Sequence, residues 1–146
     1  MRDIARFLSL EKYAIAGVSR DPKKFGQVMF RDLRKKGMDV VPINPKADTI
    51  DGVRCYSSVS DLPPEVRGVI FMTPKEETLA VAREAIAHGI KDLWIQQGAE
   101  TKSMIGDLEN EDVNLIYKQC IMMFWKPDGI HSFHRFLKKI FGGLPA

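Results

Sequence analysis

The sequence YAIAGVSRDPKKFG, at residues 13–26, decides the fold. Its apolar start, Tyr13 to Ala16, is typical of a buried strand, and Gly17 permits a sharp turn of the backbone. One hydroxyl and three cations come next: Ser19, Arg20, Lys23 and Lys24. Gly26 then opens an amphipathic segment. A strand, a glycine turn and a helix start bring free amides and the positive end of a helix dipole together. The stretch therefore predicts an anion site, which we interpret as the phosphate-binding loop of a nucleotide site.

Apolar runs alternate with amphipathic segments along the rest of the chain. Strands are expected at residues 12–17, 39–43, 69–72, 92–95 and 112–116. Helices are expected at residues 3–10, 26–36, 74–88, 101–110 and 130–141. Such alternation predicts parallel strands joined by right-handed crossovers. The 146 residues are expected to form a single domain. Its fold should be α/β, a Rossmann-like, doubly wound parallel sheet of five strands in the order 3-2-1-4-5, with helices on both faces.

Two short signals refine this prediction. Thr73-Pro-Lys-Glu76 has the pattern of a capping box, in which Thr73 and Glu76 would each bond the other's amide. Pro74 would then occupy the first helical position, where its missing N–H group costs nothing. Asp51-Gly52 is a strong signal for a tight hairpin turn.

Ligands of open parallel sheets bind outside the carboxyl ends of the strands, at the switch in strand order. With the expected order this switch falls between the first and fourth strands. The loop from Gly17 to Lys24 should then lie beside residues 96–98. Two further pairs should complete the rim: Asn44-Pro45 and Thr73-Pro74.

The residues around the first turn bear on the choice of nucleotide. The dinucleotide pattern GxGxxG is absent, because Ser19 and Pro22 stand at the second and third glycine positions. Near the end of the second strand, Asn44 stands where an acidic residue would bind a ribose diol. A carboxylate there would repel a phosphorylated ribose, whereas an amide would not. We therefore expect a ligand with more phosphate than NAD. Coenzyme A fits, with its diphosphate and ribose 3′-phosphate, and NADP fits the charge.

Several pieces of the sequence together resemble the small single-domain CoA-binding proteins, which are similar to the CoA-binding domain of the succinyl-CoA synthetase alpha subunit. The pieces are Ala16-Gly-Val-Ser19, Phe25-Gly26, Val41-Pro-Ile-Asn-Pro45, Tyr56, Thr73-Pro74, Ile95-Gln-Gln-Gly98 and Cys120. The resemblance covers about residues 10–123 and implies a CoA-binding Rossmann domain. It implies ligand contacts at Gly17, Val18, Ser19, Arg20, Asn44, Pro45, Thr73, Pro74, Gln97 and Gly98. The segment after Cys120 is longer than in the usual family pattern.

Each candidate segment also has an ordinary explanation. The basic loop could be solvated surface, Asn44-Pro45 a turn, and Thr73-Pro74 a helix cap. Gln97-Gly98 is a candidate by its strand-end position alone.

The C-terminal region offers a second set of candidates. Cys120 with His131 and His134 could form a nucleophile pair or a metal site. No orienting acid or fourth ligand stands at a recognisable interval. A packed amphipathic helix over residues 130–141 is therefore the favoured interpretation, with Met122–Trp125 as an apolar patch.

Composition limits the function classes. The net charge of +3 is too small to indicate nucleic-acid binding by itself. The two cysteines form no CxxC motif, and a reducing cytoplasm is expected. The first ten residues do not resemble a signal peptide, and no run of about 18 apolar residues predicts a membrane span.

We expect binding of coenzyme A or an acyl-CoA, with no catalytic residues, cofactor-binding residues at the loop and rim named above, and no metal. One alternative is an NAD(P)-binding oxidoreductase-type domain. The other is a regulatory module that binds a protein partner or a second copy through its C-terminal region.

Overall fold

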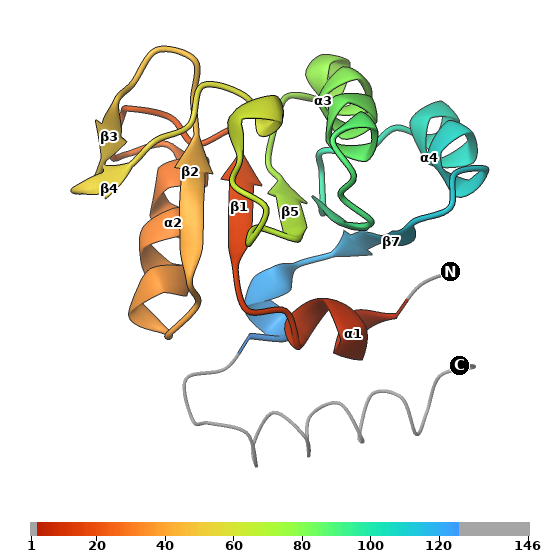
Figure 1. Cartoon of the computed structure of the whole chain (residues 1–146), viewed down its shortest axis with the longest axis horizontal. Helices are drawn as coiled ribbons and strands as arrows, with labels where there is room; N and C mark the ends of the chain where they lie inside the picture. The colour runs from red at the N-terminus through yellow and green to blue at the C-terminus, as the bar shows by residue number, and fades with distance from the viewer. Residues whose placement is uncertain (1–2, 126–146) are drawn as a thin grey trace.

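The computed structural model describes residues 3–125. Its main sheet has five strands: β1 (Tyr13–Ala16), β2 (Val40–Ile43), β5 (Gly68–Phe71), β6 (Asp92–Gln96) and β7 (Asn114–Gln119). Neighbouring strands all pair in parallel, in the order β2-β1-β5-β6-β7 (Figure 1). The predicted α/β class and five-stranded parallel sheet are confirmed. The helix expected at 130–141 lies outside the described residues.

The predicted strand order is wrong at one strand. β5, the third strand of the prediction, pairs with β1, with Tyr13 opposite Gly68 and Ala16 opposite Phe71. The place beyond β2 is instead occupied by Tyr56, whose amide donates to Pro42 O (3.0 Å) and whose carbonyl accepts from Asn44 N (2.9 Å). β5 is buried along its whole length, which suits the centre of a sheet rather than its edge.

The connection between β2 and β5 explains this order. It contains a small hairpin of β3 (Thr49–Ile50) and β4 (Val53–Arg54), then a 3-10 turn η1 (Val59–Asp61). Within this connection no α-helix is available to cross over a face of the sheet from β2 to a strand beyond it. The hairpin turn itself is as predicted, because Asp51 and Gly52 both have positive φ, at 51° and 76°.

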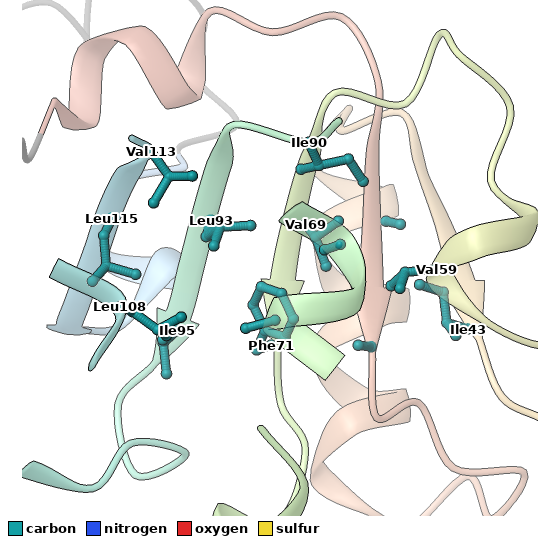
Figure 2. Packing of buried hydrophobic residues seen from close by; sticks show 14 of the residues in the cluster. Ile43, Val59, Val69, Phe71, Ile90, Leu93, Ile95, Leu108, Val113 and Leu115 are labelled. Atoms are coloured by element: carbon teal, nitrogen blue, oxygen red, sulfur yellow. The ribbon is translucent and has the colours of Figure 1, made fainter. Parts of the chain in front are cut away.

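Helices cover both faces of the sheet, as predicted (Figure 1). On one face pack α1 (Ile4–Leu8) and α2 (Phe25–Lys35), around a core that includes Phe7, Phe30 and Trp94. On the other pack α3 (Lys75–Ala87) and α4 (Lys102–Glu109). Figure 2 shows this second core, where Val69 and Phe71 of β5 lie beside Leu93 and Ile95 of β6, with Leu115 of β7 beyond them. Alternate residues of each strand thus pack into the two cores. This packing fixes the positions of the strands, and their carboxyl ends form one edge of the sheet.

Two of the differences from the predicted boundaries have a clear physical cause. The capping box does not form, because Pro74 is the N-cap of α3 and makes no side-chain cap bond. Thr73 then stands one residue too early, and its buried hydroxyl pairs with that of Thr78 at 2.6 Å. The last strand was expected at 112–116 but runs from Asn114 to Gln119. The sequence pattern missed its end because that end is polar and its backbone bends at Lys118 (φ 59°). Among residues 3–125, no helix has the length and apolar character needed to cross a membrane.

Candidate functional site

The switch in strand order lies between β1 and β5, where an open parallel sheet binds its ligand. Gly17 follows β1 with φ 93°, which confirms the predicted turn. A Cβ atom on Gly17 would lie 2.6 Å from Met72 O and 2.8 Å from Thr73 N. The loop after β1 therefore lies beside Thr73, and the expected placement beside Gln96–Gly98 is wrong. Those residues end β6, one strand further along the sheet.

Gly26 allows a second close approach. It is buried in the first turn of α2, and a Cβ atom there would overlap the carbonyl oxygen of Gly17. Close packing of helix against strand is the role of the third glycine in dinucleotide-binding loops. Gly26 fills this role from a position that the GxGxxG spacing does not include. Its signals in the sequence were a glycine at the start of the predicted helix and the pair Phe25-Gly26 in the family resemblance.

The backbone of the loop has a consistent polarity. The carbonyl of Val18 accepts from Asn44 Nδ2 at 2.8 Å, and that of Ser19 accepts from Gln27 Nε2 at 2.9 Å. In the part of the chain that the structure describes, the amides of Val18, Ser19 and Arg20 donate no hydrogen bond. Two carbonyls are thus tied to the protein while three neighbouring amides are free, and such a loop presents donors.

The helix N-termini at this edge reinforce that polarity. α2 and α3 follow the two strands that flank the switch, and their N-caps, Lys24 and Pro74, make no side-chain cap bond. By contrast, Asp3 caps α1 and Thr101 caps α4. The first amides of α2 and α3 therefore keep unused donor capacity, and the positive ends of both helix dipoles lie near the switch. This arrangement favours an anion.

A cavity of about 410 Å³ opens at this edge, between the ends of β1 and β2 and the side of α3. Six of the sequence-predicted residues line it: Gly17, Val18, Ser19, Asn44, Pro45 and Thr73. The other six lie outside its lining: Arg20, Lys23, Lys24, Pro74, Gln97 and Gly98. The loop cations are exposed at the surface. Val18 is buried, so its side chain is not available to a ligand.

Asn44 is engaged within the protein at both ends of its amide. Besides donating to Val18, it accepts from the amide of Lys46 at 2.7 Å. It therefore joins the loop after β2 to the loop after β1. One Nδ2 hydrogen remains unused by these two bonds.

The far wall of the cavity was missed by the sequence reasoning. It is formed by Ser57 and Ser58, before η1, and by Glu77, Val81 and Glu84 of α3. The hydroxyls of Ser57 and Ser58 donate to Asp61, and these hydrogen bonds lower the pKa of the Asp61 carboxyl. The only signal in the sequence was the spacing of Glu77, Val81 and Glu84, which places them along one helix face.

A thiol lies at the carboxyl edge of the sheet far from the loop after β1, next to the end of β7. Cys120, half-buried after β7, accepts from Gln96 Nε2 at 3.0 Å, while Gln96 Oε1 accepts from the amide of Ile121. Gly98, exposed on the same side of the sheet, donates its amide to Glu100 Oε2 at 3.1 Å. No cluster of three possible metal ligands occurs within residues 3–125. His131 and His134 lie outside those residues.

Other cavities lie at the opposite edge, at the amino ends of the strands. One of about 470 Å³ is lined by residues that include Arg6, Arg67 and His88, and one of about 720 Å³ by residues around Lys12 and Asp39. Size alone would favour them. The cavity at the carboxyl edge is the better candidate because glycine turns, free amides and uncapped helices converge there.

Comparisons with known proteins identify the family of this chain. Residues 11–126 match the CoA binding domain family, and the chain belongs to it. It is 33% identical to the alpha subunit of ADP-forming acetate–CoA ligase II of Pyrococcus furiosus, over 61% of this chain and 20% of the ligase. The chain thus spans about a fifth of that relative's length. The resemblance to CoA-binding domains of the succinyl-CoA synthetase type is confirmed.

Solved structures show the same fold. A conserved hypothetical protein from Pyrococcus furiosus is 41% identical, with a TM-score of 0.74 over 77% of this chain and 97% of that one. An acetyl-coenzyme A synthetase of Ca. Korarchaeum cryptofilum, solved with phosphate and ADP, is 27% identical. Its TM-score is 0.68, over 79% of this chain and 27% of the synthetase.

Proposed function

We propose that this chain binds coenzyme A or an acyl-CoA at the carboxyl edge of its sheet. The observation that carries the proposal is the free amides of Val18, Ser19 and Arg20, set beside two uncapped helix N-termini in a member of the CoA binding domain family. An array of this kind stabilises a diphosphate through charge-assisted hydrogen bonds.

Each part of the ligand has a counterpart at this edge. The diphosphate lies over the loop from Gly17 to Arg20, and the exposed Lys23 and Lys24 attract the ribose phosphate. The adenosine half enters the cavity, with Asn44-Pro45 and Thr73-Pro74 at its rim. The pantetheine arm runs along the strand ends, past Gln97 and Gly98.

Recognition without turnover is the activity that we propose. The loop, the cavity and its rim supply groups that hold phosphates and the adenine base. The matched ligase is about five times as long as the part that this chain matches. Ligase chemistry is therefore not assigned to this chain.

A protein partner is also part of the proposal. The matched relative is named as a subunit, and we propose that this chain in turn binds a partner or a second copy through its C-terminal region. Met123, an exposed large apolar side chain, lies at the start of that region.

Thermal unfolding with CoA, acetyl-CoA, NADP and NADH tests the assignment. At a ligand concentration about a hundredfold above Kd, binding stabilises the fold by about 2.7 kcal/mol. For a domain of this size that raises the Tm by roughly 5–10 °C. CoA and acetyl-CoA should give this shift and the nicotinamide nucleotides a smaller one. No shift with CoA, or a larger one with NADP, would reject the assignment. Thiol release from acetyl-CoA at the uncatalysed rate is expected as well.

A further inference from the structure

The polar side chains of the far wall present only hydrogen-bond acceptors. Ser57 and Ser58 each give their hydroxyl proton to Asp61 Oδ2, so their oxygens can only accept from another group. Glu77 and Glu84 add carboxylates from α3. The near wall, by contrast, carries the free amides of Val18 and Ser19 in the loop after β1. The two walls therefore select opposite ends of a ligand.

Glu84 is the more firmly held of the two carboxylates. It is half-buried, and its Oε1 accepts from the hydroxyl of Ser60 at 2.7 Å. That bond fixes the side chain and leaves Oε2 for another donor. Glu77 lies exposed nearer the start of the same helix and lines the same cavity. A phosphate is excluded from this wall, because like charges a few ångströms apart repel.

We propose that this acceptor wall, with Glu84 as its principal residue, reads the exocyclic amine of the adenine base; this inference rests on the proposed function. The cavity is bounded by the end of β2, Ile43 to Lys46, and the end of the second strand is where such folds place the ribose of the adenosine half. The adenine amine is a donor, whereas the keto oxygen at the same position of hypoxanthine is an acceptor.

The rest of the cavity suits a purine. Ile43, Val59 and Val81 supply apolar surface on the cavity lining, against which the faces of a base can pack. The polar groups then sit at one side, where the edge of the base would lie. An apolar lining with a few placed polar groups is the usual form of a small-molecule site. Adenine is thereby selected by hydrogen bonds to the edge of its ring as well as by the shape of the cavity.

The test compares CoA with its deaminated analogue, in which hypoxanthine replaces adenine, by calorimetry. Wild-type protein should prefer CoA by about tenfold or more, since a hydrogen bond to a charged group is lost and two acceptors are opposed in the analogue. Glu84→Gln should shrink or reverse this preference, because glutamine can donate to the keto oxygen. Glu76→Gln is the matched control, on an exposed position of α3 outside the cavity lining. It should keep the wild-type preference.

Adenosine 3′,5′-bisphosphate, which lacks the pantetheine arm, locates the effect. Its affinity should fall with Glu84→Gln by the same factor as that of CoA. Equal wild-type affinity for CoA and its deaminated analogue would overturn the inference and leave the proposed function standing. If Glu84→Gln weakened CoA binding but not binding of adenosine 3′,5′-bisphosphate, the inference would also be overturned. The wall would then contact the pantetheine amides and not the adenine. Failure of wild-type protein to bind CoA at all would overturn both. Unfolding curves without ligand confirm that each variant is folded.

Discussion

Replacing Asn44 by aspartate separates its structural role from direct contact with the ligand. In the wild-type protein Asn44 Nδ2 donates to Val18 O at 2.8 Å, and Oδ1 accepts from Lys46 N at 2.7 Å. Asn44→Asp keeps the second bond and sets a carboxylate oxygen against the Val18 carbonyl. The lost bond costs about 1 kcal/mol, and leaving two acceptors opposed adds about 1–3 kcal/mol. The Tm should fall by roughly 5–15 °C.

The pH dependence of this loss gives a second readout. The opposed carbonyl disfavours the charged carboxylate, so the pKa of Asp at position 44 should be higher in the folded than in the unfolded variant. Its protonated form can donate to Val18 O. The stability of the variant should therefore recover below pH about 4, near the unfolded pKa of aspartate, and be lost as pH rises through the folded value. Asn44→Ala, which introduces no titratable group, is the control and should show a deficit independent of pH.

Ligand binding by Asn44→Asp distinguishes two roles. If Asn44 acts by holding the loop, CoA and dephospho-CoA should lose affinity by similar factors, because both carry the diphosphate that the loop binds. Thermal shifts with both ligands measure this. Unchanged unfolding of the variant would refute the structural role. A loss for CoA far larger than for dephospho-CoA would instead mean that Asn44 reads the ribose phosphate directly.

Three further predictions concern the loop and the thiols. Gly26→Ala should lower the free energy of unfolding by about 2 kcal/mol or more, since its Cβ would overlap backbone that cannot move aside. Gly106→Ala, at an open helix position, should instead raise it by about 0.5–1 kcal/mol. Denaturant unfolding measures both. Three exposed loop cations can be removed together: Arg20, Lys23 and Lys24. Calorimetry should then show CoA affinity at least about tenfold lower and less sensitive to salt; unchanged affinity would remove the loop from the site. Cys120 should react with a thiol reagent before Cys55, because Cys55 is buried and burial raises the pKa of its thiol; faster labelling of Cys55 would contradict the packing.

Much of the fold follows from patterns that are local in the sequence. Tyr13–Ala16 and the turn at Gly17 were predicted because apolar runs and glycine turns depend on neighbouring residues alone. The place of β5 was not, because it depends on Tyr56 occupying the outer side of β2 and on the helix missing between β2 and β5. The error in order also moved the predicted neighbour of the loop from Thr73 to Gln97.

The candidate site was predicted in part for the same reason. The residues that end β1, β2 and β5 converge at the carboxyl edge in any order of a parallel sheet, so Gly17, Asn44 and Thr73 were found. The acceptor wall was not, because Ser57 and Glu84 come together only through the packing of η1 against α3. The predicted capping box was wrong by one residue. A Thr-Pro pair can place either Thr73 or Pro74 at the N-cap, and α3 uses Pro74.

Chemical-shift changes of backbone amides during a CoA titration test the central claim most directly. If CoA binds at the carboxyl edge, the largest changes should fall on the amides of Val18, Ser19 and Arg20 and on the first turn of α2. Amides around the cavity at the opposite edge, near Arg67 and His88, should stay unchanged. Saturating CoA that shifts the opposite edge and leaves Val18–Arg20 unmoved would contradict the account.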